Sequence, residues 1–100
     1  MPEPRNVRVE HGRHPRDNRP GVWITTPYDE FFVGELKATI PSRERAWDSE
    51  EVAWWVSEGE AERAIALVVH HYGETIVVDE HGTEEYRTAD GVSARQERLL

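Results

Sequence analysis

Three of the four tryptophans in this chain of 100 residues lie within one short stretch. That stretch, RAWDSEEVAWWV, spans Arg45–Val56 and places Trp47 before, and Trp54 and Trp55 after, a short acidic turn. An indole ring either fills a small hydrophobic core or presents a flat face on which a nucleic-acid base or a cation can stack. The function of the chain therefore depends on which of these rings face outward.

The stretch has the pattern of a β-hairpin around the turn Ser49-Glu50-Glu51. The register that we expect pairs Trp47 with Trp54, Ala46 with Trp55, and Arg45 with Val56. Side chains alternate between the two faces of a strand, so we expect Trp47 and Trp54 in the core, on the face that receives the helices. Trp55 lies on the reverse face, where it either stacks on an unpaired base or is covered by the N-terminal segment or the C-terminal tail.

Positive side chains near this hairpin and in the N-terminal segment are candidate phosphate contacts. Together with the outward indole they form the nucleic-acid site that we expect: Trp55, Arg43, Arg45, Lys37, Arg13, Arg16 and Arg19. A basic segment can follow a phosphate backbone, and its binding weakens as salt rises. Each residue also has an ordinary structural alternative: surface ion pairs for the hairpin arginines, a solvated helix position for the lysine, and a flexible leader for the N-terminal arginines.

Metal and catalytic chemistry lack their usual spacings. The chain has no cysteine, His11 and His14 lie in a segment with glycine and prolines, and the adjacent pair His70-His71 points in two directions, so no zinc motif is formed. Ser57 and Glu60 have the spacing of a capping box, which predicts the start of a helix and not a nucleophile. We expect no metal, no cofactor and no enzymatic activity.

The charge of the chain is acidic and unevenly spread. The formal net charge is −8, yet residues 1–20 hold five arginines against three acidic side chains. The acidic remainder repels phosphate backbones at long range. The N-terminus has no apolar signal segment, and the longest uninterrupted apolar run, Ala64–Val69, is too short to cross a membrane. We therefore expect a soluble protein of the cytoplasm without a membrane association.

Regular elements must position these residues. The sequence predicts a strand at 22–26, a helix that Asp29 caps and that ends before Pro41, the hairpin, a helix from Ser57 to Gly73, and a strand at 75–79. The order strand-helix-hairpin-helix-strand predicts an α+β fold, with a small, mostly antiparallel sheet and two helices packed on it.

We expect three parts along the chain. Residues 1–21 form a basic arm or a short strand plus loop, and residues 22–83 form the α+β domain. Residues 84–100 form a polar tail, either an edge strand or disordered.

The ordered motifs of this domain resemble the HARP (HepA-related protein) domain, a module that precedes the motor of SNF2-type annealing helicases. The resemblance is carried by Pro27-Tyr28-Asp29, Phe32-Val33, Leu36-Lys37, Ile40-Pro41, Arg45, Trp47-Asp48 and Trp54-x-Val56. It implies a stand-alone, helicase-associated module that binds nucleic acid. The chain departs from the family at Glu50, Glu51 and Val52, where basic residues are frequent, and it has no Walker A motif and hence no motor.

Two hypotheses for the function follow. The first is a non-catalytic module that binds single-stranded or forked DNA through the residues named above. The second is an acidic regulator or inhibitor that docks on a basic nucleic-acid enzyme, of the kind that phages and mobile elements encode. The resemblance favours the first hypothesis and the acidic hairpin turn favours the second, and the sequence leaves both open.

Overall fold

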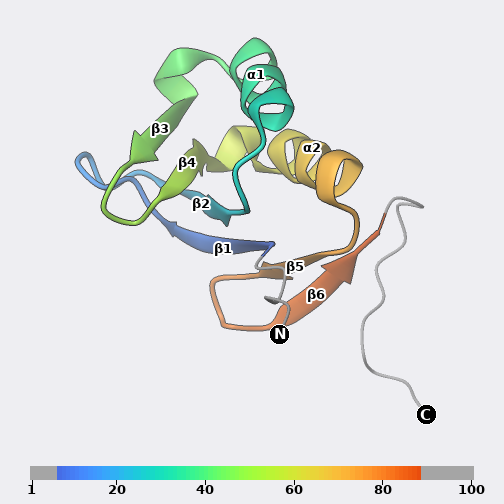
Figure 1. The fold of residues 1–100 in the computed structure, drawn as a ribbon. Coiled ribbons are helices and arrows are strands. Elements are labelled where there is room, and N and C mark those ends of the chain that lie inside the picture. Colours follow the sequence, from blue (N-terminus) through green and yellow to red (C-terminus); the bar gives the residue numbers. More distant parts are fainter. Residues whose placement is uncertain (1–6, 89–100) are drawn as a thin grey trace.

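The computed structural model of this protein describes residues 7–88, which form a six-stranded sheet and two α-helices. Along the chain the elements are β1 (Arg8–Arg13), β2 (Pro20–Thr25), α1 (Glu30–Thr39), the 3₁₀ turn η1 (Ser42–Glu44), β3 (Arg45–Asp48), β4 (Ala53–Ser57), the 3₁₀ turn η2 (Glu58–Glu60), α2 (Ala61–Tyr72), β5 (Thr75–Val78) and β6 (Glu84–Arg87). Both α-helices lie on the same side of the curved sheet (Figure 1). The α+β class predicted from the sequence is confirmed.

The strands lie in the order β3-β4-β2-β1-β5-β6. β1 pairs antiparallel with β2 on one side and parallel with β5 on the other. The parallel pair makes the sheet mixed, which corrects the expectation of a mostly antiparallel sheet. The physical reason is that β1 lies inside the sheet with one edge not taken by β2. The chain returns from α2 along this edge, and β5 pairs there with β1.

The parts expected at the two ends of the chain belong to the sheet where the structure describes them. Within the expected arm, β1 and the start of β2 form an antiparallel hairpin, and Val9 of β1 is completely buried in the core. Within the expected tail, Glu84–Arg87 form the edge strand β6, paired with β5. Residues 1–6 and 89–100 lie outside the described residues.

Both helix ends that the sequence marks most clearly are present. The Asp29 carboxylate accepts hydrogen bonds from the backbone N–H groups of Phe31 and Phe32, at 2.8 and 3.3 Å, and so caps α1. Gly73, at φ +89°, ends α2 in a conformation that glycine adopts without strain. The boundaries of α1 and the end of α2 therefore follow from local side-chain chemistry.

The start of α2 differs from the predicted capping box. Ser57 is the last residue of β4, where it is buried and pairs with Gly21 of β2. The turn η2 follows over Glu58–Glu60, and α2 begins at Ala61 without a side-chain cap. Sheet pairing therefore takes Ser57 away from the capping role that its spacing to Glu60 suggested.

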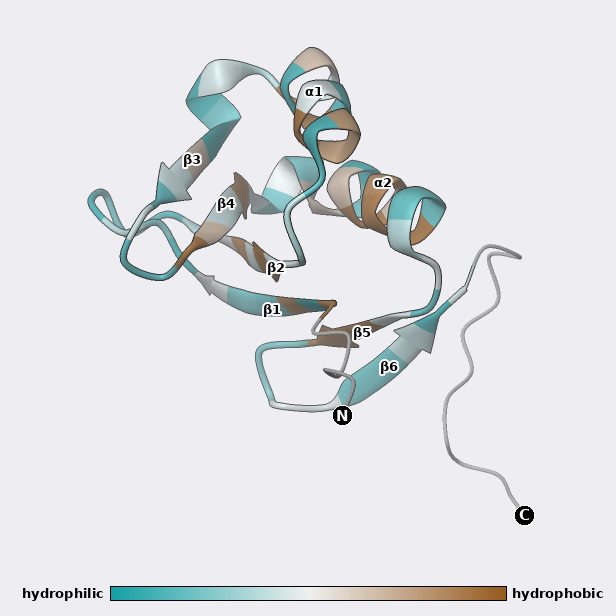
Figure 2. Cartoon of the chain, viewed as in Figure 1, coloured by the Kyte–Doolittle hydropathy of each residue, from teal (hydrophilic) through white to brown (hydrophobic). Residues whose placement is uncertain are grey.

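The core lies between the helices and one face of the sheet. Its main side chains are Val9, Val22, Ile24 and Val56 from the strands, and Phe32, Leu36, Ile65 and Val68 from the helices. Figure 2 shows the apolar stretches of α1, α2, β2 and β4 in brown, gathered where the helices meet the sheet. The spacing of Phe32 and Leu36 is the helical stripe that the sequence predicts for α1.

Candidate binding groove

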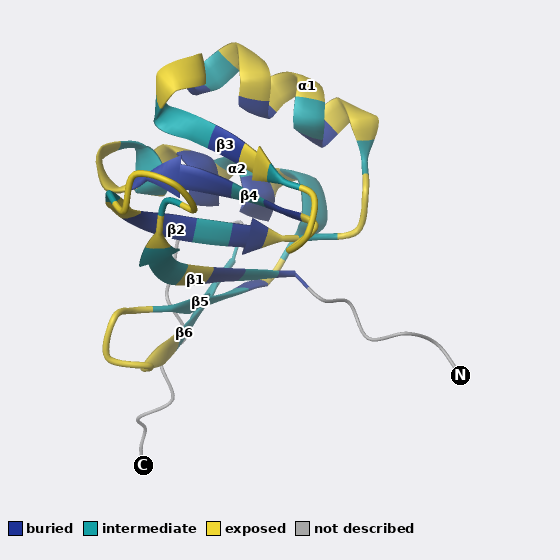
Figure 3. Ribbon diagram, turned by 90° about the vertical axis from the view of Figure 1, so that its left-hand side faces the viewer, coloured by how far each residue is buried: buried dark blue, intermediate teal, exposed yellow. Residues whose placement is uncertain are grey.

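The hairpin of β3 and β4 has the predicted register: Trp47 pairs with Trp54, Ala46 with Trp55, and Arg45 with Val56. β4 lies inside the sheet and is largely buried (Figure 3), whereas β3 is an edge strand. Trp47, expected in the core, is accordingly 48% exposed, while Trp55, offered as the outward ring, has no exposed surface. The pairing of the two strands could be predicted from the sequence. Which elements cover each face of the hairpin could not.

Trp55 is enclosed by the loop that joins β1 to β2. Its indole N–H donates to the carbonyl oxygen of Gly12 at 3.3 Å, and the His14 ring meets it edge-on at a centroid distance of 4.7 Å. The guanidinium of Arg19 lies 5.2 Å from the ring centre. A buried ring cannot stack on a base, which corrects the expectation of Trp55 as a nucleic-acid contact. The cover comes from the N-terminal segment, one of the alternatives that the sequence leaves open.

Two glycines allow the buried Trp55 and the half-buried Trp23 to lie close to neighbouring strands. A Cβ atom at Gly21 would meet the carbonyl oxygen of Val56 and would lie 2.6 Å from Cζ2 of Trp55. A Cβ atom at Gly12 would likewise meet the ring of Trp23. The reverse face of the sheet is therefore closely packed where a ligand was expected.

Arg19 holds the β1–β2 loop in place. It pairs with Asp17 at 3.0 Å and with Glu44 at 3.5 Å. It also donates to the carbonyl oxygen of Arg43 at 3.0 Å, which ties the loop to η1. The structure thus brings Arg19 and Arg43 of the predicted site together, in contacts that stabilise the loop.

Arg13, Arg16 and Arg43 of the predicted site are at the surface. Arg13 donates to the carbonyl oxygen of Asn18 at 2.9 Å, within the same loop. Arg16 is exposed, and the exposed Arg43 lies 3.9 Å from Glu44. The surface ion pair expected as the ordinary alternative is therefore present at Arg43.

Lys37 and Arg45 meet at the ring of Trp54. The Lys37 ammonium lies 6.0 Å from the ring centre and the Arg45 guanidinium carbon 5.9 Å from it. The Nε of Arg45 also donates to the carbonyl oxygen of Ile40 at 2.8 Å, which joins β3 to the end of α1. These two predicted residues are brought together, but around Trp54 in place of Trp55.

An apolar hollow lies between the start of α1 and the end of the hairpin, and we call it the aromatic groove. Its volume is about 240 Å³, and it is lined by Ile24, Thr26, Tyr28, Asp29, Phe32, Val33, Trp47, Val52, Ala53 and Trp54. Among the described residues, four large apolar side chains are exposed, and three of them line the groove: Tyr28 at 81%, Val52 at 62% and Trp47 at 48%. The fourth, Phe31, is exposed outside it.

Packing fixes two walls of the groove. The Trp47 ring lies against the ring of Trp54, with centroids 5.5 Å apart at an interplanar angle of 56°. The hydroxyl of Tyr72 donates to the carbonyl oxygen of Pro27 at 2.7 Å, directly before Tyr28, and burial raises the pKa of Tyr72. The segment before α1 is therefore tied to the end of α2, and the hairpin is held by its own aromatic pair.

Acidic side chains occur on two sides of the groove, at the start of α1 and in the hairpin turn. Asp29 lines it and Glu30 follows in the chain, while the hairpin turn carries the exposed Glu50 and Glu51. The Asp48 carboxylate accepts from the backbone N–H groups of Glu50 and Glu51, at 2.8 and 3.1 Å, and so shapes the turn. The acidic side chains beside this apolar hollow suit an apolar group carried by a positively charged ligand.

The sequence did not predict Tyr28, Trp47 and Val52 as residues of a binding site. Tyr28 directly precedes the helix cap Asp29, a signal that its side chain lies outside the helix. Trp47 is outward because β3 has a neighbour on one side only, which no local pattern reveals. Val52 lies in a turn, where an apolar residue is itself unusual.

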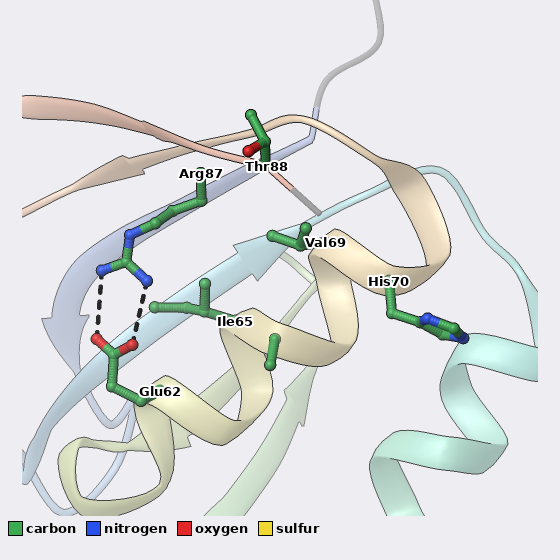
Figure 4. Close-up of a pocket in the computed structure, with 7 residues that line it drawn as sticks. Glu62, Ile65, Val69, His70, Arg87 and Thr88 are labelled. Atoms are coloured by element: carbon green, nitrogen blue, oxygen red, sulfur yellow. Dashed lines mark hydrogen bonds and ion pairs between the residues drawn. The ribbon is translucent and has the colours of Figure 1, made fainter. Parts of the chain in front are cut away.

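A second hollow, of about 270 Å³, lies between α2 and β6 (Figure 4). Arg87 donates to both carboxylate oxygens of Glu62, at 3.1 and 3.3 Å, and to Glu85 at 3.0 Å. These hydrogen bonds, that of Glu62 foremost, raise the pKa of Arg87. We interpret these hydrogen bonds as a structural contact that holds the edge strand β6 to α2.

Within residues 7–88 no three side chains of the metal-binding types gather to hold an ion, and no helix is long and apolar enough to cross a membrane. His14 packs on Trp55, and His71 packs edge-on against Phe32. Comparison of the chain with protein-family models, with curated proteins and with solved structures finds no match. The resemblance to the HARP domain stays a prediction.

Proposed function

We propose that this protein is a non-catalytic binding module that docks on a basic protein, with the aromatic groove receiving an apolar side chain of that partner. The observation that carries the proposal is the gathering of Tyr28, Trp47 and Val52, three exposed apolar side chains, around one hollow. Contiguous apolar surface is unfavourable in water until a partner covers it, so a concave patch of this kind marks an interaction site.

The groove has the composition of an interface centre. Tryptophan and tyrosine supply large contact areas with few rotatable bonds, and truncating such an anchor typically costs about 2 kcal/mol of binding free energy or more. Trp47 is supported from below by Trp54, so its ring is ordered before any partner arrives. Pre-organisation of this kind reduces the entropy lost on binding.

The charge of the chain selects the kind of partner. The formal net charge of −8 repels acidic surfaces and attracts basic ones. Acidic side chains near the groove add to this effect: Asp29 and Glu30 on one side, and Glu50 and Glu51 in the hairpin turn. A nucleic-acid enzyme with a basic surface has the complementary charge. In this role the protein acts as a cytoplasmic regulator or inhibitor, the second of the two hypotheses above.

A peptide probe tests the proposal without the natural partner. The synthetic peptide Lys-Lys-Leu-Lys-Lys is titrated into isotope-labelled protein while the indole N–H resonances are followed by NMR. We expect Trp47 and Trp54 to shift. Trp23 and Trp55, whose indole N–H groups donate to backbone carbonyl oxygens, stay in place as internal references.

Matched controls separate the groove from general charge attraction. The substitution Trp47→Ala should abolish the shift of Trp54, whereas Phe31→Ala, which removes an exposed ring outside the groove, should leave it intact. A peptide with serine in place of leucine should bind more weakly. Equal shifts with both peptides, spread over the whole surface, would refute the proposal.

A second candidate function is the binding of single-stranded nucleic acid, and one observation favours it. Lys37 and Arg45 lie 6.0 and 5.9 Å from the ring centre of Trp54, next to the exposed ring of Trp47, so cations and a stacking surface occur together. This candidate uses Trp47 in the place first given to Trp55. It predicts that oligothymidylate binding is lost on Trp47→Ala and weakened on Lys37→Ala, and that it falls steeply with salt.

A further inference from the structure

One backbone conformation in the groove is unfavourable for its residue. Among the described residues, two that are not glycine have a positive φ angle: Asn18, at φ 65°, and Val52, at φ 53°. Asparagine tolerates this left-handed region, but a β-branched residue there is an outlier, because its Cβ crowds the following carbonyl oxygen. Val52 therefore carries backbone strain that glycine or asparagine would avoid.

Neither the burial of Val52 nor the side-chain hydrogen bonds of its turn offset this strain. The side chain of Val52 is 62% exposed, so it contributes little to the core. The turn around it is shaped by Asp48, whose carboxylate accepts from the backbone N–H groups of Glu50 and Glu51, and these bonds do not involve Val52. A left-handed residue directly before β4 is a position where hairpins ordinarily use glycine or asparagine.

We infer that Val52 is a specificity-determining residue of the aromatic groove, which selects an aliphatic or aromatic side chain on a basic segment of the partner. This inference rests on the proposed function, because Val52 lines the same hollow as Trp47 and Tyr28. The strain persists because the valine methyl groups are needed by a molecule outside the chain. Strain that the fold itself does not use is characteristic of binding sites.

The chemistry of valine supports the selection of an apolar group. Branching at Cβ restricts the χ1 angle of valine, so its two methyl groups form an apolar edge with few orientations. Glutamates precede it in the turn and Asp29 lies elsewhere in the lining, which favours positive charge on the residues beside the anchor. The selected segment is therefore an apolar residue flanked by lysine or arginine.

The test compares stability and binding in the same variants. Val52→Gly and Val52→Asn relieve the strain, and we expect the melting temperature to rise by about 4–8 °C, the shift that about 1 kcal/mol gives in a domain of this size. The same variants should raise the dissociation constant for the peptide Lys-Lys-Leu-Lys-Lys about tenfold. Asn18→Gly, at the other positive φ angle and outside the groove, should leave peptide binding unchanged.

The outcomes separate this inference from the proposed function. Greater stability with weaker binding supports the inference. Unchanged peptide affinity in Val52→Gly, alongside lost affinity in Trp47→Ala, overturns the role of Val52 and keeps the groove. A lower melting temperature in both Val52 variants overturns the claim of uncompensated strain. Absence of peptide binding by the unmodified protein overturns the proposed function, and the inference with it.

Discussion

At the residue scale, the neighbours Trp54 and Trp55 have different surroundings although they share one strand. Alternation along β4 directs their rings to opposite faces of the sheet. Trp54 lines the aromatic groove beneath α1 and contacts Trp47, whereas Trp55 is sealed by the β1–β2 loop. The rings around the hairpin therefore differ in role: Trp55 packs in the interior, whereas the exposed Trp47 is the ring that the proposed function assigns to contact with a partner.

This division predicts opposite effects of two tryptophan substitutions. Trp55→Ala removes a completely buried ring and should lower the free energy of unfolding by about 3–5 kcal/mol. Trp47→Ala, at a site 48% exposed, should lower it by about 1 kcal/mol or less while abolishing peptide binding. Denaturation with urea measures both. A stable Trp55→Ala protein would contradict the burial on which the revised site depends.

A second prediction at this scale concerns acid stability. The backbone N–H groups of Thr83 and His81 donate to the Asp79 carboxylate, at 2.9 and 2.8 Å, and they lower the pKa of Asp79 in the folded state. A depressed folded pKa stabilises the protein above the unfolded pKa, about 4, and this contribution is lost as the pH falls through the folded pKa.

The matched variant is Asp79→Asn, which keeps an acceptor oxygen but does not titrate. Its free energy of unfolding should fall less than that of the unmodified protein between about pH 5 and about pH 2. Urea denaturation across this range measures the difference. Parallel pH profiles for the two proteins would contradict the predicted role of Asp79.

Residue roles were predictable from the sequence only where they depend on near neighbours in the chain. The Asp29 cap and the pairing of Trp47 with Trp54 follow from short-range spacing, and both are present. The exposure of Trp47 and the burial of Trp55 depend on elements distant in the sequence, the sheet edge and the β1–β2 loop. The aromatic groove could not be predicted for the same reason.

At the element scale, the β1–β2 hairpin determines which surface of the β3–β4 hairpin is open to a ligand. It supplies β1 to the interior of the sheet, and its loop covers Trp55. With Trp55 covered in this way, three of the four exposed large apolar side chains among the described residues lie at the groove between α1 and the β3–β4 hairpin.

Two glycine substitutions test this packing. Gly21→Ala places a methyl group against the carbonyl oxygen of Val56 and the ring of Trp55, and it should destabilise the protein by about 3 kcal/mol or more. Gly34→Ala, in the middle of α1, meets no atom within 4 Å and should stabilise the protein by up to about 1 kcal/mol. Equal melting temperatures for the two variants would show that β2 and β4 are not in close contact at Trp55.

The elements themselves were partly predictable. The stripe of Phe32 and Leu36 marked α1, and Gly73 marked the end of α2. The parallel pairing of β1 with β5 was not predictable, because within residues 1–21 strand-like alternation is limited to Val7-Arg8-Val9, and the sequence gives no partner for it. The capping box at Ser57 failed because sheet pairing with Gly21 extends β4 to that residue.

At the scale of the whole molecule, charge and apolar surface act together. In the proposed function, the net charge of −8 steers basic molecules toward the protein, and the groove then retains one with a suitable apolar side chain. We predict that raising the salt concentration from about 0.05 M to about 0.5 M slows association with the peptide Lys-Lys-Leu-Lys-Lys and leaves the dissociation rate nearly unchanged. Stopped-flow fluorescence of the tryptophans measures both rates, and a salt-independent association rate would contradict the electrostatic part of the account.

The most direct test of the central claim is a parallel NMR titration of the labelled protein with the lysine–leucine peptide and with oligothymidylate at low salt. The account predicts that the peptide shifts the indole resonances of Trp47 and Trp54, that Trp55 stays unmoved, and that oligothymidylate binds more weakly or not at all. Stronger binding of oligothymidylate at the same two resonances would contradict the account and assign the groove to nucleic acid.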